Sequence, residues 1–288
     1  MTDSTAPAEV FTSPRDPGEK ERMRHAHTTA ATALAVRSHG PEVWGCQSRT
    51  LSRRASDRWL RVVGVPKGKQ GGKLWDGTAA ADARLPHSVP RPQLHNVIEW
   101  TGGGYVYRAE LSEHLPRPAL QAGGPVLTKE LDLSDGGGRI CAPRSPPPPR
   151  CPPTVRPYAS GGSTNTSTGS SASPFQVTAW NTGHGDLHWA NLTGPELVIL
   201  DWEGWGRMPT GYDIGLLHAL SLTQPATAAR IRTEFAHVLE SPGGRNGELV
   251  ALAQLLQVVG RGRHRDLAGR LTGRAQQLTG TPVPTPTA

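Results

Sequence analysis

The sequence predicts an α+β fold in which a small antiparallel sheet precedes a mainly helical C-terminal part. Short segments rich in Val, Leu, Trp and Tyr, separated by turn residues, follow one another from residue 42 to residue 115, as in an antiparallel meander. Beyond residue 210, apolar residues recur at spacings of three and four with Gly or Pro between the segments, which is typical of helices. A chain of 288 residues is long enough for two modest lobes with a buried core.

The N-terminal part begins with polar, proline-containing residues 1–25, which predict a disordered leader. A lobe over residues 26–115 follows, with a helix expected around 23–38. The segments "EVWGCQSRTLSRR", "DRWLRVVGV" and "HNVIEWTGGGYVYRAELSEHL" predict its strands. Between the second and third, "GGKLWDGTAAADARLP" has the Ala, Leu and Lys content of one helix, so we expect a sheet with a single inserted helix.

The C-terminal part is expected to start with a linker at 116–135, to form a helical lobe over 175–280 and to end in a disordered tail at 281–288. Its predicted helices are "DIGLLHALSL", "PATAARIRTEFAHVLE", "GELVALAQLLQVVGRG" and "DLAGRLTGRAQQLTG". The leucines of the third segment have core spacing and predict buried packing, not a cofactor site; they are Leu249, Leu252, Leu255 and Leu256.

Residues 136–174 are a low-complexity tract without periodicity and with almost no large apolar residue. Such a composition buries too little surface to offset chain entropy, which favours a disordered, flexible insert. A second interpretation is translation out of frame from near Asp135 to near Pro174. "SGGSTNTSTGSSASP" can be encoded so that a shifted frame reads RWIDKYFHRFLGIP, and "GGRICAP" so that the same frame reads WWADLRA. The nucleotide sequence decides between the two.

The charge and the termini narrow the function classes. The formal charge of +7 raises nucleic acid as a partner, but four of the arginines lie in the low-complexity tract, and the rest lack aromatic interleaving. We therefore expect only weak, salt-sensitive retention on DNA. No run of about 18 apolar residues is present, and the N-terminus lacks the apolar core of a signal peptide, so the sequence predicts a cytoplasmic protein without a membrane span.

The stretch "HGDLHWANLTGPELVILDWEGWG", from His184 to Gly206, concentrates polar side chains around one apolar run. Asn191 follows Asp186 by five positions, and Asp201 ends the apolar run. A turn at "TGP" between two short strands would bring Asn191 and Asp201 together. A carboxylate and a carboxamide oxygen are hard ligands that suit Mg²⁺, and a second carboxylate nearby can accept a proton from a hydroxyl nucleophile. These are the parts that phosphoryl transfer needs.

The set "HGDLHWANL…ILDWEGWG…GYDIG" resembles the aminoglycoside phosphotransferase family of small-molecule kinases. The Asp-to-Asn spacing also equals that of the protein-kinase catalytic loop. The match is dense from Thr182 to Leu220 and weaker over the N-terminal lobe. The resemblance implies a two-lobed, protein-kinase-like fold, with ATP or GTP and Mg²⁺ in the cleft and a small-molecule hydroxyl as acceptor. It leaves the acceptor and the oligomeric state open.

The resemblance also implies roles for the residues of this stretch. Asp186 would be the catalytic base that orients the substrate hydroxyl, and Asn191 and Asp201 would hold Mg²⁺. Glu203 would lie near the acceptor side and touch metal or substrate.

Three further residues would support the loop. His184 would brace it through backbone hydrogen bonds, and His188 would pack beneath it. Asp213, in "GYDIG", would cap the next helix and tie that helix to the catalytic loop.

In the N-terminal lobe, the family places a basic residue on the third strand to hold the ATP phosphates, paired with a carboxylate on the following helix. Arg61 in "RWLRVV" matches this position, with Asp76 in "GKLWDG" as its partner and Lys73 as a substitute for Arg61. The segment "WGCQSRTLS" would cover the phosphates.

The segment "AELSEHL", from Ala109 to Leu115, resembles the hinge between the lobes. Leu111 and Glu113 would pair there with adenine through the backbone.

Three alternatives stay open at this stage. His184, Asp186 and His188 could form a metal site, although no further ligand has suitable spacing. The chain could be a catalytically impaired kinase remnant, because the tract at 136–174 replaces the helix expected before the catalytic loop. It could also be a basic nucleic-acid-binding protein. Arg61 could equally be an ordinary surface residue of a strand, and His114 and His218 are expected to be structural.

Overall fold

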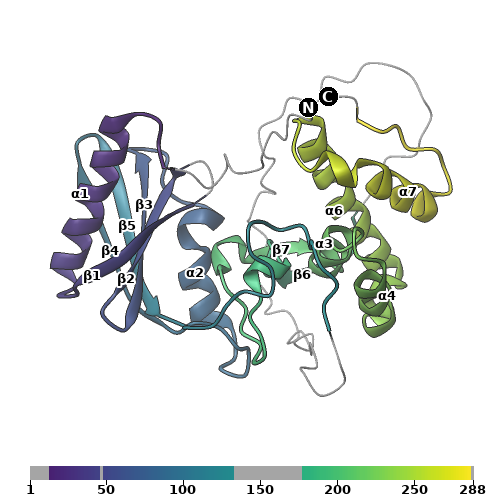
Figure 1. The fold of residues 1–288 in the computed structure, drawn as a ribbon, viewed down its shortest axis with the longest axis horizontal. Helices are drawn as coiled ribbons and strands as arrows, with labels where there is room; N and C mark the ends of the chain where they lie inside the picture. The colour runs from purple at the N-terminus through teal and green to yellow at the C-terminus, as the bar shows by residue number, and fades with distance from the viewer. Residues whose placement is uncertain (1–12, 46–47, 133–176, 287–288) are drawn as a thin grey trace.

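The computed structural model describes residues 13–45, 48–132 and 177–286. It has two parts (Figure 1): a sheet covered by α1 on one side, and a group of helices, with α2 between them. The α+β fold class expected from the sequence is confirmed. The tract at 136–174, the three cysteines and the first twelve residues lie outside the described residues, so the expectations about them stay predictions.

Helix α1 (Pro17–Ala33) begins earlier than the sequence analysis placed it, so the leader predicted at 1–25 is wrong in its second part. The start has a physical cause. The Asp16 carboxylate accepts a hydrogen bond from the Gly18 amide at 2.9 Å, and Pro17 occupies the first helical position. One face of α1, with Met23, Ala26 and Ala30, is buried in the core of the sheet.

The sheet contains β1 (Ser38–Trp44), β2 (Thr50–Ala55), β3 (Arg58–Pro66), β4 (Leu94–Gly102) and β5 (Tyr105–Glu113). All neighbouring strands are antiparallel, and their order is β1-β2-β3-β5-β4. The predicted meander is therefore correct only for the first three strands. After α2 the chain enters the edge strand β4 and returns through β5, which pairs with β3 and lies inside the sheet.

Helix α2 (Lys73–Arg84) is the inserted helix that the sequence predicted. It packs Trp75 against the sheet, where the Trp75 indole N–H donates to Glu99 at 3.0 Å. On its other side α2 approaches the large lobe closely at Gly77, because a Cβ atom there would lie 2.1 Å from the Glu203 carbonyl oxygen. Gly77 thus allows the backbone of α2 to lie against the loop of residues 184–205, called the functional loop below.

The large lobe starts with residues 116–132, which run along its helices: the Leu127 amide donates to the Leu220 carbonyl at 3.0 Å. Its helices match the predicted segments with two exceptions: "PATAARIRTEFAHVLE" is divided in two at Phe235, and the helix of "GELVALAQLLQVVGRG" already begins at Pro242. They are α3 (Tyr212–Leu220), α4 (Pro225–Glu234), α5 (Ala236–Leu239), α6 (Pro242–Gly260) and α7 (Ala268–Thr279). Leu252 and Leu255 are buried between them, whereas Leu249 and Leu256 are only partly buried.

A two-stranded ribbon precedes these helices. Strands β6 (Trp180–Gly183) and β7 (Gly206–Pro209) pair so that Gly183 lies opposite Gly206. The ribbon therefore closes a loop of residues 184–205, which contains the predicted motif. Within the described residues, no helix is long and apolar enough to cross a membrane.

Candidate active site

The functional loop is held at its start by Asp213 of α3. The Asp213 carboxylate accepts hydrogen bonds from the amides of His184 at 2.7 Å and Gly185 at 2.9 Å. Asp213 thus ties α3 to the loop, but it does not cap the helix as expected: the N-cap position is Gly211, and Asp213 already lies in the first turn. Gly185 has φ +86°, and a Cβ atom there would lie 2.3 Å from the Gly204 carbonyl oxygen, so this position requires glycine.

The same helix holds the loop a second time. The buried Trp189 indole N–H donates to the Ser221 hydroxyl at 2.7 Å, and Ser221 follows the last residue of α3. Ser221 in turn donates to the Leu217 carbonyl at 2.7 Å. Both ends of α3 therefore anchor the loop.

His184 connects the two halves of the loop. Its Nε2 lies 2.7 Å from the Leu200 carbonyl oxygen, and its Nδ1 accepts from the Asp186 amide at 3.2 Å. These two partners fix the tautomer with the proton on Nε2. Both ring nitrogens are thereby used, which argues against a metal site at His184, Asp186 and His188. Within the parts of the chain that the structure describes, no three His, Cys, Asp or Glu side chains form a metal-binding group.

The turn at Thr193–Pro195 brings Asn191 and Asp201 to one side of the loop. Residues Leu192 and Ile199 form an isolated antiparallel bridge, and the Leu200 amide donates to the Asn191 carbonyl at 2.8 Å. In the described structure this single bridge takes the place of the two short strands that the sequence predicts. The Thr193 hydroxyl supports the turn instead, because it accepts from the Val198 amide at 3.0 Å.

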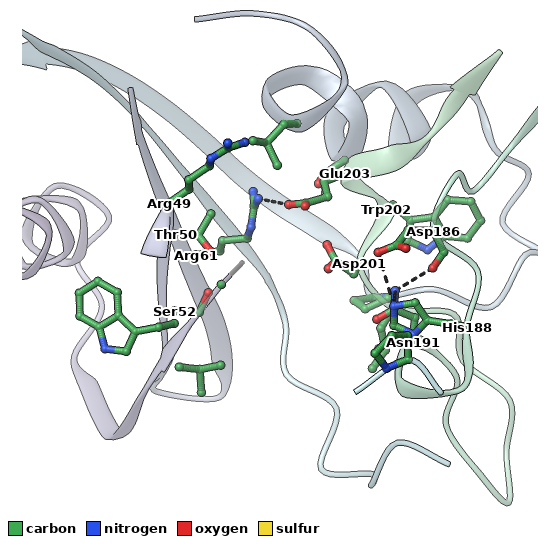
Figure 2. Close-up of a pocket in the computed structure, with 18 of the residues that line it drawn as sticks. Arg49, Thr50, Ser52, Arg61, Asp186, His188, Asn191, Asp201, Trp202 and Glu203 are labelled. Atoms are coloured by element: carbon green, nitrogen blue, oxygen red, sulfur yellow. Dashed lines mark hydrogen bonds and ion pairs between the residues drawn. The ribbon is translucent and has the colours of Figure 1, made fainter. Parts of the chain in front are cut away.

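Asp186 faces the cleft beside His188 and Asn191 (Figure 2). Its carboxylate lies 3.5 Å from His188 Nε2, and its side chain is 52% exposed. The Asn191 amide nitrogen donates to the Asp186 carbonyl at 2.9 Å, which leaves the Asn191 carboxamide oxygen as the group it can offer to a ligand. His188 thus lines the cleft, while its side chain is only 13% exposed.

The pKa of Asp186 is shifted in the opposite direction from the pKa values of Asp201 and Glu203 on the same loop. Burial alone would raise the pKa of Asp186, but the hydrogen bond and charge of His188 outweigh it, and the pKa lies below its ordinary value. Burial raises the pKa of Asp201, with the charge of Arg61 opposing this and that of Asp186 adding to it. Burial and the charge of Asp201 raise the pKa of Glu203 to about 7. Desolvation and mutual repulsion of these two carboxylates therefore outweigh the positive charge of Arg61.

Arg61 of β3 provides the positive charge that the described structure places in this cluster. Its guanidinium donates to Glu110 of β5 at 3.1 Å and to Glu203 across the cleft (Figure 2). The predicted pairing with Asp76 is wrong, because Asp76 is exposed on the outer side of α2. Lys73 is exposed as well and donates to the Arg207 carbonyl at 3.3 Å, so it does not take the place of Arg61.

The cleft that contains these residues has a volume of about 900 Å³ and is lined by both lobes. Gly45 and Arg49 line it from the turn between β1 and β2, and Glu113 from the end of β5. The expectation for Leu111 is wrong. Leu111 pairs with Leu60 on one side and Asn96 on the other, and its side chain is buried in the core of the sheet. Because the backbone of Leu111 lies between two neighbouring strands, it is not available to a ligand.

Comparison with solved structures decides the fold. A structure of the amicoumacin kinase hAmiN in complex with AMP-PNP, Ca²⁺ and Ami aligns over 93% of this chain and 97% of that chain, with a TM-score of 0.50 and 10% sequence identity. The chain has a protein-kinase-like fold. The identity is too low to carry more than the fold. Neither a protein-family model nor a curated protein matches the sequence.

In this kinase-like fold, the donor set of the loop fits a divalent cation. The carboxylate of Asp201 and the carboxamide oxygen of Asn191 are hard oxygen ligands, and two protein ligands suffice for Mg²⁺ when phosphates complete the shell. Both residues line the same cleft, so their oxygens are open to a bound ion.

Two parts of the site escaped the sequence analysis. Glu110 is 3% exposed and partners Arg61, but nothing local marks it, because the pairing depends on the register of β3 against β5. The wall formed by Gln254, Arg263 and His264 lies far from the motif along the chain. The left-handed backbone of His264, with φ +52°, is a signal only the structure supplies.

Proposed function

We propose that the chain is an ATP- and Mg²⁺-dependent phosphotransferase that acts on a hydroxyl of a small molecule, in the manner of the aminoglycoside phosphotransferase family. The observation that carries the proposal is the grouping of Asp186, Asn191 and Asp201 on one loop, opposite Arg61 in a cleft between two lobes. The kinase-like fold supports it. GTP in place of ATP fits the same groups.

The nucleotide would lie at the small-lobe side of the cleft. Arg61 would bind its phosphates, with Arg49 nearby at the turn between β1 and β2. The base would lie against the end of β5, where Glu113 and the two residues after it line the cleft. Bound Mg²⁺ would be held by Asn191 and Asp201 and would neutralise charge on the phosphates.

Asp186 is placed to serve the acceptor. Its carboxylate would accept a hydrogen bond from the substrate hydroxyl and take the proton as the oxygen attacks the γ-phosphorus. The bond between that phosphorus and the oxygen bridging to the β-phosphate breaks, and the nucleoside diphosphate leaves with the electron pair. His188 orients Asp186, and Asp213 and Trp189 fix the loop that carries it.

An impaired kinase remnant is the alternative that the tract at 136–174 raised. The described contacts favour the active enzyme, because both anchors of the loop come from α3. The hydrogen bonds of Asp213 and of Trp189 with Ser221 involve no residue of that tract. The loop geometry is thus supported independently of it.

The test is nucleotide binding and phosphoryl transfer by the full-length chain over a panel of hydroxyl compounds. Asp186→Asn is expected to lower kcat by roughly 10²- to 10⁴-fold with little effect on nucleotide affinity. The matched control is Asp57→Asn, whose side chain is 80% exposed on the turn between β2 and β3 and which should leave both unchanged.

The outcomes separate the alternatives. Nucleotide binding without transfer to any acceptor, in the wild type, would favour the remnant. Absence of nucleotide binding would contradict the kinase function altogether.

A further inference from the structure

The cleft has two ends of different chemistry. All the carboxylates that line it lie at the small-lobe end or on the functional loop: Glu110, Glu113, Asp186, Asp201 and Glu203. The opposite end is formed by α3, α6 and the turn after α6. Its apolar floor consists of Leu216, Leu220, Leu255 and Val258. Among the described residues that line this end, none is acidic.

We infer that this large-lobe end is the acceptor subsite, and that it selects a hydroxy compound with an apolar body and a carboxylate, which Arg263 binds. The inference rests on the proposed function and adds the substrate class. A polyamine would meet no carboxylate of the described lining at this end, whereas it would have to share the space with Arg263.

The polar groups of this end are arranged as donors. The Tyr212 hydroxyl donates to Gln254 Oε1 at 2.6 Å. This bond uses Gln254 Oε1 and leaves the amide N–H groups of Gln254, which lines the cleft, as donors for a ligand. Arg263 adds a guanidinium, whose planar donors match a carboxylate. A ligand with acceptor oxygens is therefore complementary to this wall.

The turn that presents Arg263 has a defined conformation. Gly262 and His264, on either side of Arg263, both have left-handed backbone, with φ +85° and φ +52°. The Arg263 amide donates back to the Val258 carbonyl at 3.3 Å, and the Leu267 amide to the His264 carbonyl at 3.0 Å. A non-glycine residue in this region is strained, so the surrounding contacts must hold His264 there.

The subsite is contiguous with the reacting group. Tyr212 lies close enough to the loop that the charges of Asp213 and Asp186 add to the effect of burial in raising the pKa of its phenol. Asp186, Gln254 and Arg263 line the same cleft, so Asp186 and the large-lobe end border one continuous space. Pockets for a single ligand span about 300–1,000 Å³, so a cleft at the upper end of that range has room beside a nucleotide for a small acceptor.

The experiment measures binding by calorimetry, with full-length protein, in the presence and absence of Mg²⁺ and AMP-PNP. The probes are a medium-chain ω-hydroxycarboxylate, the ω-amino alcohol of equal length and the unsubstituted alcohol. Wild type is expected to bind the carboxylate about tenfold more tightly than the amine, as one charge-assisted hydrogen-bonded pair predicts. R263Q should abolish this preference. R261Q, an equal change at an exposed residue of the same turn that does not line the cleft, should retain it.

Equal or tighter binding of the amine, loss of the preference in both variants, or no binding of any probe would overturn the inference. A preference that depends on Arg263 in a chain that binds no nucleotide would support the subsite and contradict the phosphotransferase function. Nucleotide binding and phosphoryl transfer without this preference would support the phosphotransferase function and contradict the subsite.

Discussion

Arg61 of the small lobe and Glu203 of the large lobe form an ion pair across the cleft. The pair is part of a chain of charges, because Arg61 also binds Glu110, which accepts from Arg108 Nε at 3.3 Å. Arg108 in turn donates from Nη1 to Glu99 Oε1 at 2.5 Å. The loop that carries the candidate catalytic residues is thereby connected to the interior of the sheet.

The buried ion pair between Arg61 and Glu110 should contribute measurably to the stability of the fold. The side chain of Arg61 is 14% exposed and that of Glu110 is 4% exposed. Arg61→Met removes one of the two arginine partners of buried Glu110, which keeps Arg108, and should lower the free energy of unfolding by about 2 kcal/mol. The double variant with Glu110→Gln should lose less than the sum of the two single variants, because the interaction between Arg61 and Glu110 is counted in both single variants. Denaturant unfolding of the two single variants and the double variant measures both.

Arg24→Met is the control, since Arg24 pairs with Glu42 at the surface and its loss should change stability little. Additive effects of the Arg61 and Glu110 changes would show that the two side chains do not interact.

Loss of the Asp213 carboxylate should make the start of the functional loop more mobile. Asp213→Asn keeps one acceptor oxygen and places an N–H₂ group against the second amide, so one of the two hydrogen bonds is lost. Asp213→Ala loses both. Hydrogen exchange of the His184 and Gly185 amides should therefore be faster in the Asn variant than in wild type, and fastest in the Ala variant. Equal protection in all three proteins would contradict the anchoring role.

These contacts show what the sequence could and could not predict. The spacing of Asn191 and Asp201 is local, so the sequence could predict the turn that brings them together. The partner of Arg61 was not, because Glu110 and Glu203 lie 49 and 142 positions away and only the folded sheet brings them close. Asp76 was the nearest acidic residue in the expected helix, but the rotation of α2 turns it to solvent.

The start of α1 and the position of Leu111 are different cases, since the sequence contained usable signals for both. Asp16 followed by Pro17, with Glu19 in the first turn, is a helix N-terminus signature within the supposed leader. Leu111 is an apolar residue within a strand pattern, which favours a core position over a ligand contact.

Two helical glycines should respond to alanine in opposite directions. A Cβ atom at Gly77 would lie 2.1 Å from the Glu203 carbonyl, so Gly77→Ala must displace either α2 or the functional loop and should cost about 2–3 kcal/mol. At Gly273 in α7 the same atom meets nothing within 4 Å. Gly273→Ala should therefore stabilise the fold by about 0.5–1 kcal/mol through lower chain entropy. Thermal unfolding of both variants checks the signs, and stabilisation by Gly77→Ala would refute the close approach of α2.

Glu248 predicts how stability depends on pH. Its carboxylate on α6 is fully buried and lies 2.9 Å from His218 Nδ1, and Arg274 of α7 donates to both its oxygens, at 2.7 and 2.9 Å. Burial alone would raise the pKa of Glu248, but the hydrogen bonds from His218 and Arg274 outweigh it and lower the pKa to about 2.

A pKa that is lower in the folded than in the unfolded state stabilises the fold above the unfolded pKa of about 4.3, and this contribution is lost as the pH falls toward 2. Wild type should therefore be more stable than Glu248→Gln at pH 7, by an amount on the order of 3 kcal/mol, and the difference should shrink between about pH 4.5 and pH 2. Denaturant unfolding at several pH values measures it. Glu196→Gln is the control, because the Glu196 side chain is 73% exposed and should give no such pH-dependent difference. A deficit of Glu248→Gln that persists undiminished in acid would mean that shape, and not the charge on Glu248, joins α6 to α7.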